Sequence, residues 1–116
     1  MYYEYVVEGM RAAVTGGTCT ELWMYGLDVC AKTGTVQNPH GRNHSACIAF
    51  APMNSPKIAI SVFVENGGSG ATLSIPIARL MLMQFFNGEL PAWEQWNVNR
   101  ITNWSTAPGS INYISY

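Results

Sequence analysis

The amino-acid sequence predicts an α+β fold, in which a three-stranded antiparallel meander packs with helices. Three segments support this prediction. Residues 2–14 carry apolar side chains at helical spacing, residues 27–65 contain three runs of strand character separated by turn residues, and residues 72–87 form an apolar helix-like segment. Because the connections between the three runs are short, we expect neighbouring strands to pair antiparallel.

Size and charge narrow the class of protein. The 116 residues fit one domain or a piece of one, and a hydrophobic content of 48% is enough for a core. Only 11% of the residues are charged, against roughly 25% in an average soluble protein. Part of the surface is therefore expected to be covered by something else. Six Lys and Arg against seven Asp and Glu leave no basic patch, which argues against nucleic acid as a partner.

The first predicted helix covers residues 2–14. Its apolar residues recur at spacings of three and four and form one stripe: Tyr2, Val6, Met10 and Ala13. Gly16 and Gly17 are expected to supply the left-handed residue that ends many helices. Residues 17–26 have mixed character and are predicted to form a loop or short turns.

Three strands are predicted at residues 27–35, 45–51 and 57–65. In the first, apolar and threonine side chains alternate with polar or small ones, and in the third the β-branched residues fall on one face. Those β-branched residues are Ile58, Ile60, Val62 and Val64. Residues 37–43 and 52–56 are rich in Asn, Pro, Gly and Ser, which predicts turns between the strands.

The second predicted helix runs from about residue 72 to Asn87. Thr72 or Ser74 is expected to cap it, Pro76 suits its first turn, and Gly88 is its stop. The segment is apolar almost all round, which predicts burial on both sides. Its interruption by polar residues makes it too short for a membrane span.

Pro91 begins a third predicted helix. Four residues form a stripe at helical spacing: Trp93, Trp96, Ile101 and Trp104. Core packing is the first interpretation of this stripe, and a surface for a partner is the second. The tail from Ser105 onward receives no assignment.

The cysteines and histidines do not predict a metal site. Three cysteines cannot close a disulfide framework, and we expect Cys19, Cys30 and Cys47 to be small buried residues. Cys30 and Cys47 together with His40 and His44 lack the spacing of structural zinc sites, so neither a metal nor a cofactor is expected. The glycine-rich residues 66–72 lack the Gly-Lys-Ser/Thr ending of a phosphate-binding loop.

The first predicted strand carries Lys32-Thr33-Gly34-Thr35. Lys-Thr-Gly is one of three motifs of penicillin-recognising enzymes. A tripeptide alone is weak evidence, but Phe50-Ala51-Pro52 and Glu65-Asn66-Gly67-Gly68 follow it. On these residues the chain resembles, over about residues 2–88, class B penicillin-binding proteins of the elongation type, known as penicillin-binding protein 2.

The sequence departs from this family in two ways. Ala31 precedes the lysine where the family usually has glycine, although both residues are small. The family's Ser-x-x-Lys, which carries the nucleophile, and its Ser-x-Asn lie upstream of Lys-Thr-Gly, and no serine precedes Lys32 here. The resemblance therefore implies that residues 1–116 are the C-terminal portion of a transpeptidase domain of the serine β-lactamase-like fold, inactive alone, with residues 89–116 a family-variable extension.

The resemblance also implies roles for the motif. The parent protein would cross-link peptidoglycan stem peptides by serine acyl transfer and bind β-lactams. The substrate would lie along the strand as an added strand, with the Thr35 backbone N–H as one oxyanion donor. The hydroxyls of Thr33 and Thr35 would bind the substrate carboxylate, Lys32 would supply positive charge, and Gly34 would leave space. Alternation places Lys32 and Gly34 on the opposite face from the threonines, so a twist or bulge at Gly34 is expected.

Two histidines follow the motif. His40 is predicted to be exposed in the loop after the strand, and His44 to orient that loop by hydrogen bonding. Both are candidates for substrate contact at the edge of the cleft.

Partners and location follow from the resemblance as well. The parent protein would be anchored in the bacterial inner membrane, with this domain outside the cytoplasm and elongation-machinery proteins as partners. In the family the strand at residues 57–65 pairs with a strand from the start of the domain, so an exposed edge and self-association are expected here. Two alternatives stay open: the end of a β-lactam sensor or β-lactamase-type domain, and a non-catalytic interaction module.

Overall fold

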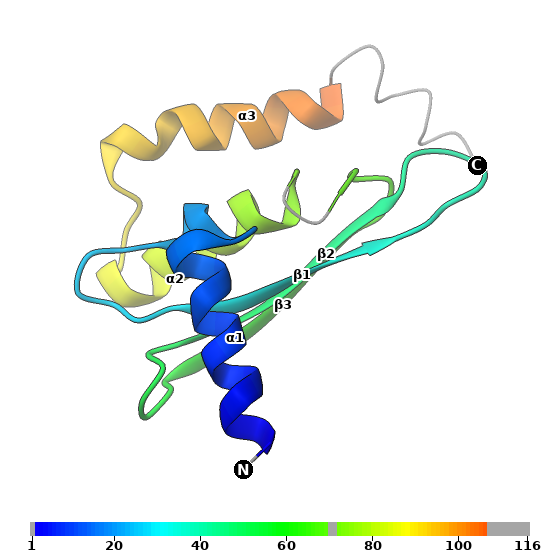
Figure 1. Ribbon diagram of the computed structural model, residues 1–116. Coiled ribbons are helices and arrows are strands. Elements are labelled where there is room, and N and C mark those ends of the chain that lie inside the picture. Colours follow the sequence, from blue (N-terminus) through cyan, green and yellow to red (C-terminus); the bar gives the residue numbers. More distant parts are fainter. Residues whose placement is uncertain (1, 70–71, 107–116) are drawn as a thin grey trace.

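The computed structural model describes residues 2–69 and 72–106, with side chains as far as residue 103. Figure 1 shows three strands with helices packed around them. The elements are α1 (Tyr2–Gly16), the 3₁₀ turn η1 (Thr20–Leu22), β1 (Cys30–Val36), β2 (His44–Ala51), β3 (Ile58–Val64), α2 (Ser74–Asn87), the 3₁₀ turn η2 (Ala92–Glu94) and α3 (Gln95–Thr106). The predicted α+β class is confirmed.

The three strands form one antiparallel sheet in the order β1-β2-β3. Thr33 lies opposite Cys47, and Cys47 lies opposite Val62 on the third strand. The predicted meander is confirmed, because short turns connect strands that are neighbours in the sheet. Among the described residues, β1 and β3 are both edge strands.

The two faces of the sheet differ. One face packs against α2 and carries the core, whose residues include Ala31, Ala49, Val62, Ile75, Ala78 and Leu82. The β-branched side chains of β3 lie on this face, as predicted. The opposite face exposes half or more of Ile48 and Phe63 to solvent. Met10 of α1 borders that open face beside Ile48 and Phe50, and α1 crosses in front of the strands in Figure 1.

Helix α1 departs from its prediction in two respects. Its apolar stripe is not buried as a unit, because Tyr2 and Val6 are exposed and Val14 alone is fully buried within the helix. The helix ends without a left-handed glycine. Gly17 instead lies against the helix itself, where an added Cβ would approach the Ala13 Cα to 2.8 Å. The absence of a side chain, rather than left-handed backbone freedom, is what this position requires.

Helix α2 ends at Gly88, whose φ of 79° is the predicted left-handed stop. Its start differs from the prediction, because Leu73 occupies the N-cap position and makes no side-chain cap. Thr72 bonds Ser69 through its hydroxyl at 2.7 Å instead. Burial on both sides was also a wrong prediction: Met81 is 43% exposed, because α2 has the sheet on one side only.

The turn η2 and the first turn of α3 reverse the expected burial. Trp93 is 70% exposed and Trp96 53% exposed, so the interpretation of the stripe as core is wrong for these two residues, whereas Ile101 is half-buried. The buried residues are instead Glu94, at 1% exposure, and Asn97. Arg79 on α2 donates two hydrogen bonds of 3.0 Å to the Glu94 carboxylate. The side of η2 and α3 that carries Glu94 and Asn97 therefore faces α2. The Trp104 side chain and the tail at 107–116 lie outside the described residues.

Candidate active-site strand

The strand β1 presents the Lys-Thr-Gly-Thr segment at an edge of the sheet. Within the described residues β1 pairs with β2 alone, so its other edge faces away from the sheet. Lys32 and Thr35 are exposed, and Thr33 and Gly34 are half-buried. An edge of this kind can accept an extended peptide as a further strand.

The ladder between β1 and β2 is regular. Every residue from Cys30 to Val36 has one partner, from Phe50 to His44, with no residue left over. The bulge expected at Gly34 is therefore absent.

Two side chains donate hydrogen bonds to backbone carbonyls in or next to β1. The Lys32 ammonium donates to the Thr33 carbonyl at 3.0 Å, and the Arg11 guanidinium donates to the Val29 carbonyl at 2.8 Å. The N–H and C=O of one residue in an antiparallel strand point to the same side, and the side alternates along the strand. Odd-numbered residues of β1, including Thr33 and Thr35, therefore direct their backbone groups toward the outer edge.

The Thr33 hydroxyl has a partner from another segment. Its Oγ1 lies 3.2 Å from Oγ1 of Thr18, which precedes η1. Thr33 shares its face of the sheet with Cys47, whereas Lys32 and Gly34 lie on the open face, where a shallow hollow of about 260 Å³ includes Phe63. Sequence reasoning missed Thr18, which is 15 residues from Thr33 along the chain.

The loop after β1 is held by amide groups. His44 Nδ1 accepts from the Asn66 backbone N–H at 2.9 Å, so this hydrogen bond goes to the loop after β3, and the orientation of the loop after β1 by His44 stays a prediction. The Asn38 side chain donates to Asn66 Oδ1 at 2.7 Å, and Asn43 Oδ1 accepts from the Asn38 backbone. Asn66 has a φ of 58°, which asparagine tolerates better than most residues. His40 is exposed, as predicted.

Asn38 and Asn66 were not predicted as members of this network. Asparagine followed by glycine is a turn signal, so the sequence shows where Asn66 bends the chain. It does not show that a loop 28 residues away depends on the same amide.

The cysteines are not candidate nucleophiles. All three are free, and they are buried as predicted. Burial raises the pKa of the Cys30 and Cys47 thiols, which keeps both protonated. In the described part of the chain, no three His, Cys, Asp or Glu side chains are arranged to hold a metal ion, and no helix is long and apolar enough to cross a membrane.

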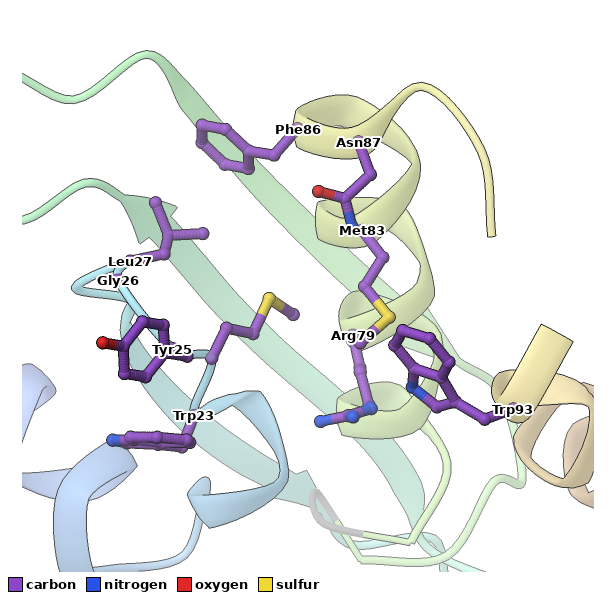
Figure 2. Close-up of a pocket in the computed structure, with 10 residues that line it drawn as sticks. Trp23, Tyr25, Gly26, Leu27, Arg79, Met83, Phe86, Asn87 and Trp93 are labelled. Atoms are coloured by element: carbon purple, nitrogen blue, oxygen red, sulfur yellow. The ribbon is translucent and has the colours of Figure 1, made fainter. Parts of the chain in front are cut away.

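A larger hollow of about 570 Å³ lies away from β1. Figure 2 shows Trp23 and Tyr25 on one side of it and Arg79, Met83 and Trp93 on the other. The guanidinium of Arg79 is already engaged by Glu94, and none of the Lys-Thr-Gly-Thr residues contributes to this hollow.

Comparisons with known proteins by sequence and by structure all give penicillin-binding transpeptidases. The family model for the penicillin binding protein transpeptidase domain matches residues 1–82. The chain is 37% identical over 73 residues to the peptidoglycan D,D-transpeptidase PbpA of Mycobacterium tuberculosis, an alignment covering 55% of this chain and 15% of the relative.

Two solved structures are similar. Pseudomonas aeruginosa PBP2 in complex with WCK 5153 superposes with a TM-score of 0.64 and 34% identity, over 78% of this chain and 21% of that one. The ceftriaxone acyl-enzyme complex of penicillin-binding protein A from M. tuberculosis gives a TM-score of 0.57 and 34% identity, over 63% and 18% of the two chains. The chain spans less than a fifth of the length of the curated relatives that it matches.

Proposed function

The chain belongs to the penicillin-binding protein transpeptidase family, and from this premise we propose that it is part of a peptidoglycan D,D-transpeptidase. In this proposal residues 1–116 are the C-terminal portion of the transpeptidase domain. They provide the Lys-Thr-Gly wall of a site that binds β-lactams and cross-links stem peptides, and residues 89–116 are a family-variable extension. The M. tuberculosis relative crystallised as a ceftriaxone acyl-enzyme supports β-lactam binding.

The observation that carries this proposal is the placement of Lys32-Thr33-Gly34-Thr35 on an edge strand. A substrate peptide can add to β1 along the outer edge, where Thr33 and Thr35 direct their backbone groups. Gly34, which lacks a side chain, keeps the approach from the open face free of steric conflict. The hydroxyls of Thr33 and Thr35 then bind the substrate carboxylate, and the Lys32 ammonium adds positive charge beside it.

The Thr35 N–H is one of two donors to the oxyanion in this proposal. Acyl transfer also requires a serine with an activating lysine, and these 116 residues contain no Ser-x-x-Lys. That serine would come from a longer protein containing this chain, and its own N–H would be the second donor. His40 in the β1–β2 loop and His44 at the start of β2 are proposed to contact substrate at the edge of the cleft.

The first experiment is intact-mass spectrometry after incubation with a fluorescent penicillin. We expect no adduct on the 116-residue chain and one adduct per molecule on the longer protein. A stoichiometric serine adduct on the chain alone would contradict the assignment of the nucleophile to another segment. A longer protein that forms no adduct would contradict the proposed function itself.

Substitution at Thr35 tests the backbone geometry. Proline removes the N–H, and an edge strand tolerates proline where its N–H points outward. We expect Thr35→Pro to fold and to lower the acylation rate of the longer protein by about 10²–10³-fold, the usual cost of one oxyanion donor. Thr35→Ala is the control, because it keeps the N–H and removes only the hydroxyl. A Thr35→Pro variant that acylates like Thr35→Ala would refute this role.

Location and partners are proposed on family membership. The parent protein would be anchored in the bacterial inner membrane with this domain outside the cytoplasm, and it would work with elongation-machinery proteins. The isolated chain is proposed to self-associate through β3, which is the other edge of the described sheet and exposes Phe63. A strictly monomeric chain in concentrated sedimentation runs would count against this last point.

A further inference from the structure

The short segment before η1 is held rigidly at both ends. Gly17 donates its backbone N–H to the Ala13 carbonyl at 3.1 Å, and Cys19 donates to the same carbonyl at 2.9 Å. Gly17 packs so closely on α1 that a side chain would not fit, and Cys19 is fully buried. Thr18, between these two fixed residues, is thus placed by the backbone rather than by its own side chain.

The Thr18 hydroxyl has two neighbours. Its Oγ1 lies 3.2 Å from Thr33 Oγ1 and 3.7 Å from the Cys19 sulfur. A hydroxyl has one proton to donate and two lone pairs that can accept. In the pair formed by Thr18 and Thr33, either oxygen can be the donor, so the pair has two possible directions.

A bound carboxylate would remove this ambiguity, because an ionised carboxylate only accepts hydrogen bonds. Thr33 must then give its proton to the carboxylate, and its oxygen is left to accept one from Thr18. We propose that Thr18 is a positioning residue for the carboxylate-binding hydroxyl of Thr33. The proposal rests on the proposed function and deepens it. Hydrogen bonds arranged in such a chain polarise and strengthen one another.

The substrates best suited to test this carry or lack the relevant carboxylate. Benzylpenicillin has it as an ion, and benzylpenicillin methyl ester has it blocked. The experiment compares their second-order acylation rates on the longer protein for the wild type, Thr18→Val and Thr18→Ser. Valine keeps the shape of threonine without the hydroxyl, whereas serine keeps the hydroxyl. Thr15→Val is the matched control, because the Thr15 hydroxyl bonds the Ala12 carbonyl within α1 and not the site.

The expected result is a change in the ratio of the two rates. Thr18→Val should lower the rate with benzylpenicillin about fivefold, the equivalent of one net hydrogen bond, and leave the rate with the ester nearly unchanged. Thr18→Ser and Thr15→Val should keep the wild-type ratio. An equal loss with both substrates would show a merely structural effect and overturn the proposal.

A second measurement tests the positioning on the 116-residue chain without any catalysis. Three-bond NMR couplings report whether the Thr33 side chain holds one χ1 rotamer. We expect one rotamer in the wild type and in Thr18→Ser, and rotamer averaging in Thr18→Val. Unchanged couplings in Thr18→Val would overturn the positioning role. A wild-type longer protein that fails to acylate would instead overturn the proposed function, and the couplings would still decide whether Thr18 orients Thr33.

Discussion

Helices α2 and α3 follow each other along the chain and are attached to the body of the molecule in opposite ways. Helix α2 buries Ile75, Ala78 and Leu82 against the sheet, so its attachment to the sheet is mainly apolar, with one buried hydrogen bond of 3.0 Å from the Ser74 N–H to the Ser45 hydroxyl. Trp93 of η2 and Trp96 of α3 are exposed, and polar contacts join η2 and α3 to the rest of the molecule. A prediction from hydrophobicity alone buries Trp93 and Trp96 and exposes Glu94 and Asn97, which is the opposite of the observed burial.

The attachment of α3 is a set of five polar side chains, called here the polar joint: Glu21, Arg79, Glu94, Asn97 and Arg100. Arg79 binds both oxygens of Glu94 and also the Glu21 carbonyl. Arg100 binds the Glu21 carboxylate at 2.8 Å and the Asn97 side chain. A buried carboxylate is tolerable only when it is paired and hydrogen-bonded, and Arg79 supplies both conditions for Glu94.

The largest effect is expected from removing one partner of this joint. Arg79→Met would leave the Glu94 carboxylate buried without its cation, which costs about 3–5 kcal/mol in comparable pairs. Urea unfolding followed by circular dichroism measures the loss. The double variant Arg79→Met with Glu94→Met should recover part of it, because both polar groups then leave the interior. A single variant within about 1 kcal/mol of wild type would contradict the importance of the joint.

Shortening a buried side chain on α2 tests the apolar attachment of that helix. Leu82→Ala should cost about 3 kcal/mol, from lost burial and the cavity left behind. The exposed neighbour Met81→Ala is the control and should stay within about 0.5 kcal/mol. Added salt should leave the Leu82→Ala penalty unchanged. Equal penalties at positions 81 and 82 would show that α2 does not pack as described.

Acid should weaken the joint before it weakens the core. Hydrogen bonds from Arg79 hold the pKa of the Glu94 carboxyl below its usual range, and they outweigh the opposite effect of burial. A lowered native pKa stabilises the fold above the unfolded-state pKa of about 4.3, and this contribution is lost as pH falls through the native value. Thermal unfolding between pH 7 and 3 should show this loss in the wild type and less of it in Glu94→Gln. Parallel curves for the two proteins would disprove it.

The smallest effect is expected at the exposed tryptophans. The Arg100 guanidinium carbon lies 4.7 Å from the ring centre of Trp96, a geometry worth roughly 0.5–1 kcal/mol at an exposed site. Trp96→Leu should cost no more than that in urea unfolding. Trp93→Leu, which has no such contact among the described residues, should be neutral. A loss above about 2 kcal/mol at either position would restore the interpretation of this stripe as core.

The strands were the most predictable part of the fold. The third was predicted at 57–65 and observed at Ile58–Val64, because alternation and turn residues are local signals. Burial of the helices was less predictable, since it depends on what lies opposite. The sequence around Glu94 does not indicate that a hydrogen bond from Arg79, 15 residues earlier, would bury Glu94 while the neighbouring Trp93 and Trp96 stay exposed.

The candidate site divides in the same way. The placement of Lys32–Thr35 on a strand was correctly predicted from the sequence, whereas the roles of these residues and of His44 stay predictions. The contact between Thr18 and Thr33 could not be predicted, because it arises only when Gly17 closes against α1. Of the twist or bulge expected at Gly34, the bulge is wrong because the ladder from Cys30 to Val36 is regular, and the twist stays a prediction.

The polar joint also has a consequence for how the sequence can diverge. Glu21 and Arg79 lie within the segment matched by the family model, whereas Glu94 and Arg100 lie beyond its end. Relatives that replace the C-terminal segment would therefore lose the reason to keep an acidic residue at 21 and an arginine at 79. Across an alignment of homologues, these four positions should change together.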